Sequence, residues 1–360
     1  MRAVKVVAVA CAAVALAAVA VVAPGGPQAR AVIFQTPAIT VADGNSVIAV
    51  QTSGDGLRFY WNEHGTNTWH KEDVAPDSTT FSSPSIAQVG DFVVIAVQGP
   101  SGSLDLYWQK NGGSGWNLQV VAGTGTTFGV PSVTADGDSV IIAAEGTGNR
   151  LDFYWSASVG SDWHHEPVAG WGTTFSDPAM TVNGNSVNIA AVGPAESLDF
   201  YWAANGTSTW HPEVVAGTGT TYFDPAIAVS DGIVNLAVLD TSGVGTEFYW
   251  AVNGTATWHP ESMPGASILT PSITVNKGQV EVFDITNVGA IGDASTVSGS
   301  GVWQWAQLSP VRSVRVSPAV TINDGIENIA VIDQNGDLVF YWNDGGTLYV
   351  PEVVDVASSL

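Results

Sequence analysis

The sequence predicts an all-β fold, a seven-bladed β-propeller built from seven repeats of about 47 residues with four strands each. Prolines open the repeats at intervals of 46 or 47 residues: Pro37, Pro84, Pro131, Pro178, Pro225, Pro271 and Pro318. A Tyr-Trp pair and a further tryptophan follow most of these prolines at nearly constant offsets. The repeats show no helical period, and their short β-branched runs are separated by glycine-rich turns.

The N-terminal segment has the features of a secretion signal. Arg2 and Lys5 precede an unbroken apolar run from Val6 to Ala23, and Ala29-Arg30-Ala31 offers a cleavage site before Val32. We therefore interpret residues 1–31 as a signal peptide; the alternative is an uncleaved membrane anchor. The single cysteine, Cys11, lies in this segment, so a secreted chain would contain no disulfide and no thiolate metal site.

The charge of the chain is strongly acidic. It has 33 acidic against 10 basic residues and a net charge of -23. Such a surface repels phosphate backbones, so the composition argues against a nucleic-acid partner and favours solubility.

Each repeat contains four predicted strands, which the fourth repeat shows in order. They are PAMTV (178–182), SVNIAAVG (186–193), LDFYWAA (198–204) and STWHPEVV (208–215), with turn sequences between them. The repeats occupy residues 32–356 and leave 357–360 as a C-terminal tail. Because the first repeat begins with a first strand and the last ends with a fourth, we expect contiguous blades and a ring closed by packing of blade 1 against blade 7.

The third strand is expected to form the core between blades. Side chains alternate along a strand, so Leu198, Phe200 and Trp202 share one face while Asp199 and Tyr201 share the other. Both faces of a propeller blade pack against neighbouring blades. Large aromatic residues on both faces are therefore what the fold requires.

The fourth strand carries a recurrent W-H-x-E pattern with two possible roles. A structural role would bury the tryptophan and tie the polar residues to neighbouring groups. A binding role would stack the aromatic face on a sugar ring and use histidine and glutamate for its hydroxyls. The pattern is intact in four repeats: Trp69, His70 and Glu72; Trp163, His164 and Glu166; Trp210, His211 and Glu213; Trp258, His259 and Glu261.

Two loop features add candidate sites. The connections after the second and fourth strands should emerge on the same face of the ring, and Trp171 stands in one of them where other repeats have threonine. An exposed tryptophan in a glycine-rich loop is a candidate ligand contact, or it covers a neighbouring blade. Asp136-Gly137-Asp138 could belong to a calcium site or to a hairpin turn, and no other cofactor is indicated.

The tandem units, with their recurrent FYW strand and glycine-rich connections, resemble the bacterial and fungal propeller lectins, including tachylectin-like and fucose-binding ones. This resemblance covers the whole chain after the N-terminal segment. It implies sugar binding in pockets between adjacent blades, with several sites per ring. Fold alone does not establish such a function.

No catalytic constellation stands out from the repeats. The arginines that a sialidase would need are scattered as Arg58, Arg150, Arg312 and Arg315, and no carboxylate pair is singled out. We therefore expect a secreted, non-catalytic, multivalent, lectin-like monomer whose partners are glycans or cell-surface glycoconjugates. The alternative is a secreted or cell-envelope scaffold that binds a protein, and a glycoside hydrolase ranks below both.

Overall fold

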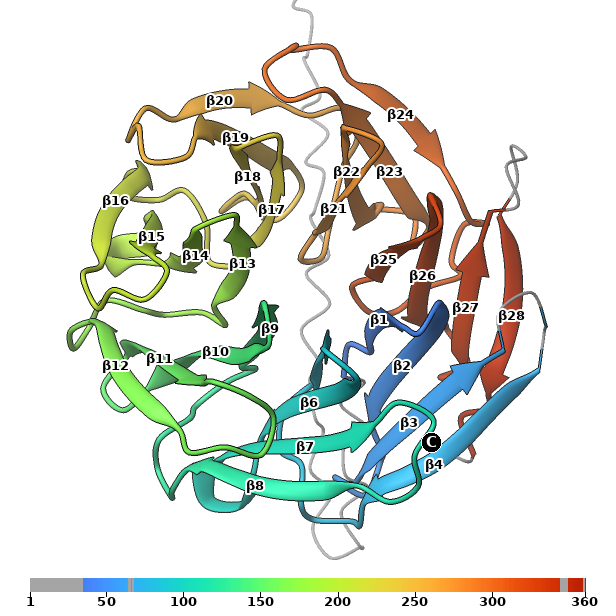
Figure 1. Ribbon diagram of the computed structural model, residues 1–360. Coiled ribbons are helices and arrows are strands. Elements are labelled where there is room, and N and C mark those ends of the chain that lie inside the picture. Colours follow the sequence, from blue (N-terminus) through green and yellow to red (C-terminus); the bar gives the residue numbers. More distant parts are fainter. Residues whose placement is uncertain (1–34, 64–65, 67, 344–348, 359) are drawn as a thin grey trace, which may run out of the picture. The chain divides into compact units, whose positions relative to one another are not determined.

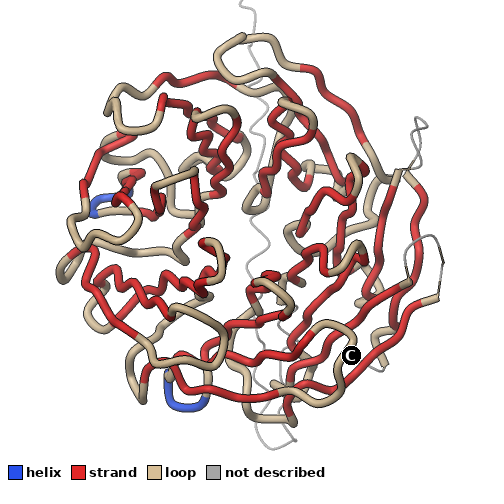
Figure 2. The backbone as a smooth tube through the Cα atoms, in the orientation of Figure 1, coloured by secondary structure: helices blue, strands red, loops and turns tan. Residues whose placement is uncertain are grey.

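The predicted all-β propeller is confirmed by the computed structural model, which describes residues 35–63, 66, 68–343, 349–358 and 360. These residues form seven four-stranded antiparallel sheets arranged as the blades of a ring (Figure 1). Strands and loops make up nearly all of the tube in Figure 2, and the helical parts are the short 3₁₀ turns Pro100–Gly102 and Pro194–Glu196. The predicted signal peptide lies outside the described residues.

The first four blades have the following strands. Blade 1 contains β1 (Ala38–Ala42), β2 (Asn45–Gln51), β3 (Leu57–Asn62) and β4 (Trp69–Ala75). Blade 2 contains β5 (Ser85–Val89), β6 (Phe92–Gln98), β7 (Leu104–Lys110) and β8 (Asn117–Ala122). Blade 3 contains β9 (Ser132–Asp136), β10 (Ser139–Gly146), β11 (Arg150–Ser156) and β12 (His164–Ala169). Blade 4 contains β13 (Ala179–Asn183), β14 (Ser186–Val192), β15 (Leu198–Ala204) and β16 (His211–Ala216).

The last three blades repeat this order. Blade 5 contains β17 (Ala226–Ser230), β18 (Ile233–Leu239), β19 (Thr246–Val252) and β20 (His259–Ser262). Blade 6 contains β21 (Ser272–Asn276), β22 (Gln279–Ile285), β23 (Ile291–Thr296) and β24 (Gln304–Gln307). Blade 7 contains β25 (Ala319–Asn323), β26 (Ile326–Ile332), β27 (Leu338–Trp342) and β28 (Val350–Asp355).

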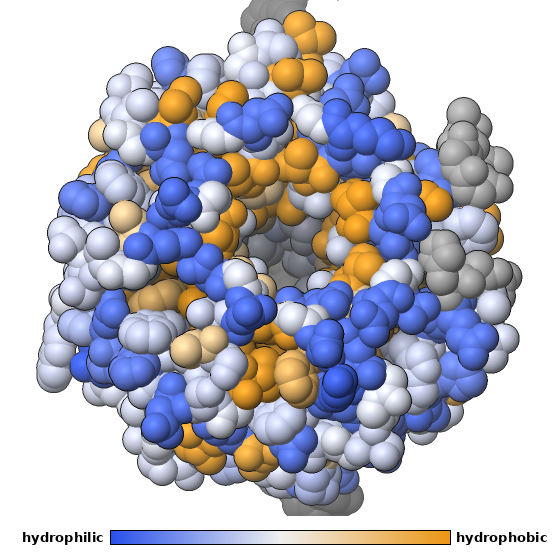
Figure 3. Space-filling model, viewed as in Figure 1, coloured by the Kyte–Doolittle hydropathy of each residue, from blue (hydrophilic) through white to orange (hydrophobic). Residues whose placement is uncertain are grey.

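Every blade is drawn from one contiguous segment, as expected from the sequence. The strands pair in chain order, with the first strand of each blade beside the central opening and the fourth at the rim (Figure 1). The prolines directly before the first strands and the first residues of these strands line this opening, together with Asp177 and Asp224. Apolar residues gather around it on the face shown in Figure 3.

The core lies in the seams, which are the interfaces between consecutive blades. Tyr201 packs with Ile141 and Phe153 of blade 3, whereas Leu198, three residues earlier on the same strand, packs with Leu236 and Tyr249 of blade 5. The two faces of β15 thus serve two different seams. The packing role expected for the third strand is confirmed.

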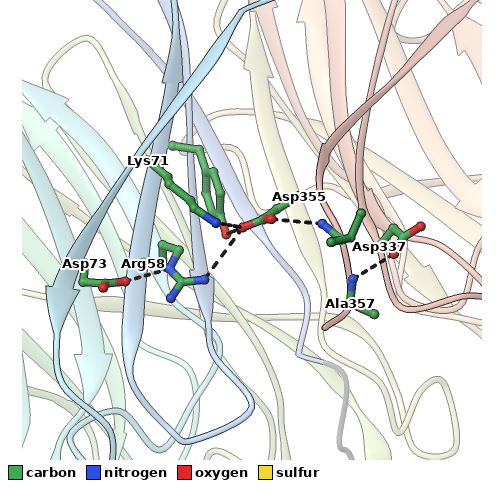
Figure 4. A network of polar contacts seen from close by, with 8 residues as sticks. Arg58, Lys71, Asp73, Asp337, Asp355 and Ala357 are labelled. Carbon is green, nitrogen blue, oxygen red and sulfur yellow. Dashed lines mark hydrogen bonds and ion pairs between the residues drawn. The ribbon is translucent and has the colours of Figure 1, made fainter. Parts of the chain in front are cut away.

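The ring closes by contacts between blade 1 and blade 7, without a shared strand. Ile48 and Tyr60 join an apolar cluster with Ala330 and Phe340. Asp355 accepts hydrogen bonds from the hydroxyl of Tyr60 at 2.8 Å and from Nζ of Lys71 at 2.9 Å. Figure 4 shows this network between blade 1 residues and the end of blade 7.

Candidate functional site

In blades 1 to 6, a tryptophan stands at the start of the fourth strand or directly before it and packs across a seam onto the preceding blade. The ring of Trp258 meets Phe200 edge-on, with centroids 5.0 Å apart, and Trp210 meets Phe153 in the same way at 5.2 Å. Trp69 makes this contact with Phe340 across the closing seam, at 5.0 Å. These indoles are half-buried and join neighbouring blades.

The glutamate of the pattern links two tryptophans in different blades. Oε1 of Glu213 accepts a hydrogen bond from Nε1 of Trp202 at 2.9 Å, and Oε2 accepts one from Nε1 of Trp258 at 3.0 Å. Glu261 holds Trp250 and Trp303 in the same way, and Glu352 holds Trp342 and Trp69. At these three seams both carboxylate oxygens are engaged within the protein.

The histidine of the pattern covers the third-strand tryptophan of its own blade. His164 stacks on Trp155, His211 on Trp202 and His259 on Trp250, with centroids 4.1 to 4.2 Å apart. Each exposed imidazole thus occupies an indole face that a sugar ring could otherwise use. In blade 1 the stack is looser, because the centroids of Trp61 and His70 are 5.3 Å apart.

The predicted W-H-x-E residues therefore differ from blade to blade in their hydrogen-bond partners. Trp69, Glu213, Trp258 and Glu261 belong to complete Trp-Glu-Trp bridges. Glu166 accepts from Trp155, but Nε1 of Trp163 and Nε1 of Trp210 have no partner in the described part of the chain. Glu72 lines a cavity, and a ligand role for the pattern stays a prediction.

This cavity lies at the seam between blades 1 and 2 and has a volume of about 350 Å³. Its walls include the aromatic rings of Phe59 and Trp61, and the carboxyl groups of Asp43, Glu63 and Glu72. Gln109, Lys110 and Asn111 of blade 2 line the opposite side. The combination is an aromatic surface surrounded by polar groups.

A loop asparagine shows how this seam differs from others. Nδ2 of Asn205 donates to Oδ1 of Asp136 in the preceding blade at 2.9 Å, and Nδ2 of Asn253 donates to the hydroxyl of Ser186 at 2.6 Å. Asn111 occupies the same place in blade 2, yet its side-chain amide has no partner among the described residues. The bridge that joins blades 3 and 4, and blades 4 and 5, is thus missing beside the cavity.

Further polar atoms around the cavity are buried without a partner in the described residues. They are Oε1 of Gln109, a lining residue that is only 8% exposed, and Nε1 of Trp116. Trp116 does not line the cavity, but its ring packs on the lining residue Phe59. Together with the amide of Asn111, these polar atoms offer both donors and acceptors. Since buried polar groups normally have partners, this cluster is what a bound polar ligand would satisfy.

Trp171 lies far along the chain from this seam, in the connection between blades 3 and 4. It is 77% exposed, and its indole rests on Gly148 in a loop of its own blade. A Cβ atom at Gly148 would come 3.1 Å from Cε3 of Trp171, so glycine is needed for this close approach as well as for its φ of +74°.

The described residues contain no group of three or more His, Cys, Asp or Glu side chains arranged to hold a metal ion. The Asp136 carboxylate of the candidate calcium loop accepts the hydrogen bond from Asn205 across a seam. Within the same part of the chain, no helix has the length and hydropathy needed to span a membrane.

Sequence reasoning missed Gln109 and Asn111. Asn111 stands in an Asn-Gly turn, as Asn205 and Asn253 do, so its local sequence looks the same. Its distinguishing feature is the lack of a partner across the seam, which depends on the preceding blade. The departure from W-H-x-E in blade 2, where Asn117 and Gln119 replace His and Glu, marks the same blade as different.

No protein-family profile and no curated protein sequence matches the chain. Among solved structures, it is similar to the BP39L lectin from Burkholderia pseudomallei, with 18% identity, coverage of 89% of this chain and 99% of the lectin, and a TM-score of 0.78. It is also similar to a variant of the Aleuria aurantia lectin in complex with α-methyl-L-fucoside, with 11% identity, coverage of 78% and 97%, and a TM-score of 0.51.

A third similar structure is the β-propeller domain of the Trilobed protease from Pyrococcus furiosus, described as having an open velcro topology. It has 8% identity, coverage of 89% of this chain and 98% of that chain, and a TM-score of 0.56. At such identities the likeness shows the fold alone. The expected resemblance to propeller lectins is confirmed at that level, and the same ring also occurs in a protease.

Proposed function

We propose that this protein is a secreted, non-catalytic, monomeric propeller that binds carbohydrate in the cavity between blades 1 and 2. The observation that carries the proposal is that Gln109 and Asn111 line a cavity with an aromatic wall and have buried polar atoms without a partner among the described residues. The similarity to structures of sugar-binding lectins supports it. The cavity volume of about 350 Å³ also lies within the range of small-ligand sites.

Different residues of the cavity would contact the apolar face and the hydroxyl groups of the sugar. Trp61 offers an indole to the apolar side of a pyranose ring, because its histidine cover is displaced in comparison with blades 3, 4 and 5. Glu72 would accept hydrogen bonds from sugar hydroxyls, and the amide of Asn111 would both donate and accept. At the seams with complete Trp-Glu-Trp bridges, a sugar would first have to displace His211 or His259.

A glycan array followed by calorimetric titration of the strongest hit tests the proposal. Trp61→Ala and Asn111→Ala should each weaken binding about tenfold or more, because stacking and buried hydrogen bonds contribute one to a few kcal/mol. His211→Ala, at a bridged seam, is the matched control and should leave the affinity within about twofold.

If the array detects no glycan, the proposal is wrong and a protein-interaction scaffold becomes the leading alternative. If His211→Ala weakens binding as much as Trp61→Ala does, the ligand lies at the W-H-x-E sets in general. That result would overturn the proposal that the cavity between blades 1 and 2 is the binding site.

A further inference from the structure

One face of the ring is built from the connections after the second and fourth strands of each blade, and we call it the loop face. Backbone hydrogen bonds join the two connections within a blade. Gly125 N donates to Ser101 O at 3.0 Å in blade 2, and Gly172 N donates to Gly148 O at 2.8 Å in blade 3. The expected placement of these loops on one face is confirmed, and their backbones are fixed.

The loop face carries a repeated series of exposed aromatic side chains. They stand 47 residues apart along the chain and are 43 to 56% exposed: Phe81, Phe128, Phe175 and Tyr222. Ile268 follows at the same place in the next repeat and Arg315 in the one after. The series thus spans the ends of the first four blades.

The backbone of the three phenylalanines is anchored, whereas the hydroxyl of Tyr222 has a side-chain hydrogen bond with Glu196. The preceding threonine is fully buried in all four cases: Thr80, Thr127, Thr174 and Thr221. The N–H groups of Phe81, Phe128 and Phe175 donate to strand-end carbonyls of the next blade, at 2.8 to 3.1 Å. The fold thus uses the threonine and the backbone, and a small polar side chain could replace each exposed ring.

Exposed aromatic residues are concentrated on this face. Within the described part of the chain, six large aromatic side chains are exposed, and five of them belong to the loop face when Trp171 is added to the series; the sixth is Trp305 of β24. Single exposed apolar residues are ordinary, but their repetition on one face indicates a binding surface. Trp171 rests on Gly148 and leaves most of its side chain exposed for contact with a ligand.

The charge of these loops limits the ligand. Residues 123–129, 170–176 and 217–223 contain no charged side chain, and the whole chain has a net charge of -23. A polyanion would be repelled by the net charge, and a cationic partner would find no carboxylate within these three segments. The loop-face carboxylates of Asp77 and Glu196 lie in other connections. The rings are also separated by threonine and glycine, whereas a lipid or protein surface would favour one contiguous apolar patch.

We propose that the loop face binds a neutral polysaccharide, with successive sugar rings stacking on Phe128, Trp171 and Phe175. A ligand with repeated units matches a surface with repeated platforms, and several weak contacts give avidity. The proposal rests on carbohydrate binding as the proposed function. It adds a second, extended surface and a ligand class that the cavity between blades 1 and 2 does not require.

Affinity electrophoresis in gels that contain soluble neutral polysaccharides (xylan, glucomannan and hydroxyethylcellulose), with alginate as the polyanionic control, tests this surface. The wild-type chain should be retarded by at least one neutral polymer and not by alginate. The triple variant Phe128→Ser, Trp171→Ala, Phe175→Ser should raise the dissociation constant at least tenfold. Because all three side chains are exposed, the variant should unfold at the wild-type temperature.

Two control variants separate this surface from the cavity. Trp305→Ala, which removes the exposed tryptophan outside the loop face, should be retarded as the wild type is. Trp61→Ala should lose binding of the array ligand and keep polymer binding, whereas the triple variant should keep the array ligand.

The outcomes distinguish the two proposals. If no mono-, oligo- or polysaccharide binds, both are wrong. If a polymer binds the triple variant as tightly as the wild type, only the loop-face proposal is overturned. A different ligand for this face would also overturn the loop-face proposal. This would be the result if the wild type bound no polymer but bound phosphatidylcholine vesicles, or self-associated in gel filtration, and the triple variant did not.

Discussion

Glu213 joins two tryptophans of different blades with a single carboxylate. Indole N–H groups that are half-buried need acceptors, and a charged acceptor gives stronger hydrogen bonds than a neutral one. The aromatic edge contact between Phe200 and Trp258 lies at the same seam. At the scale of one residue, polar and apolar contacts thus fix the same pair of blades.

Replacement of Glu213 by alanine should therefore destabilise the fold. Two indole N–H groups would lose their acceptor, and the free energy of unfolding should fall by about 2–3 kcal/mol in urea denaturation. Glu72→Ala is the matched control, since Glu72 lines the open cavity, and it should change stability by less than about 1 kcal/mol. Equal losses in the two variants would show that the bridge contributes nothing specific.

Blade 6 shows what happens when an element departs from the repeat. Asp293 and Ser295 stand where other third strands have phenylalanine or leucine and a tryptophan. Asp293 pairs with Ala306, where other blades have glutamate or glutamine. The seam with blade 7 brings together Glu281 of β22, Asp293 of β23 and Glu327 of β26. Asn276 donates a hydrogen bond to Glu327, and the hydroxyl of Tyr349 does so at 3.4 Å.

Burial and mutual repulsion favour the protonated forms of these acids. Burial, followed by the charges of Glu327 and Asp293, raises the pKa of Glu281 to about 8. Burial, followed by the charges of Glu327 and Asp284, raises the pKa of Asp293 to about 7. Because the folded state holds these protons more tightly than the unfolded state, the contribution to stability is full below about pH 4 and is lost as the pH rises through 7 to 8.

Glu281→Gln should remove part of this pH dependence. The variant should melt at a higher temperature than the wild type at pH 8.5, where an ionised Glu281 is costly, and differ little at pH 4.5. Thermal melts across this range provide the measurement. Asp138→Asn, at an exposed turn position, serves as the control. A destabilised Glu281→Gln variant at pH 8.5 would contradict this account.

At the scale of the whole molecule, the ring depends on the seam between blades 7 and 1. Asp355 is 9% exposed and faces Lys71, Tyr60 and Arg58 of blade 1, with Nη1 of Arg58 at 3.7 Å (Figure 4). Burial and the hydrogen bond to Asp355 raise the pKa of Tyr60, which keeps its hydroxyl a donor at neutral pH. No covalent link supports this seam among the described residues, so side-chain contacts and the backbone hydrogen bond from Ser53 N to Leu360 O, at 2.9 Å, must hold it.

Asp355→Ala should weaken the closed ring more than most surface changes. The loss of a largely buried carboxylate that faces two cations should cost about 3 kcal/mol, measured by urea denaturation. Hydrogen exchange should rise first in β1 to β4 and in β25 to β28, which flank the seam. Asp91→Ala, which removes an exposed ion pair with Lys110, is the control and should have little effect. Uniform exchange throughout the ring would contradict the local role.

The repeat predicted the fold because each blade is encoded locally. Proline spacing, turn residues and alternating strands all lie within one 47-residue unit, so the blades, their contiguity and the packing of the third strand follow from the sequence. The contacts between side chains at the seams could not be derived in this way, and the candidate site depends on such contacts.

Trp69 at the closing seam is an example. It donates a hydrogen bond to Glu352, which is 283 residues away, and no local sequence pattern shows that the two residues meet.

Whether a polar side chain at a seam has a hydrogen-bond partner also depends on the neighbouring blade. Asn111 and Asn205 stand in similar turns, yet within the described part of the chain only the side chain of Asn205 has a partner across its seam. The exposed rings of Phe81, Phe128, Phe175 and Tyr222 were equally hidden in the sequence, because an aromatic residue in a β-rich repeat is usually core. Trp171 was recognised since it alone breaks the repeat.

The contiguity of the blades has a consequence for how such a protein can change over generations. Each sheet is encoded by one uninterrupted stretch of about 47 codons, and in the described residues no blade contributes a strand to the sheet of another blade. A single in-frame duplication, deletion or recombination between repeats therefore exchanges a whole blade and leaves every other sheet complete. Each such event also creates a new pair of facing surfaces at a seam, where the proposed sugar-binding cavity lies, so a binding specificity located there could diversify by exchange of blades.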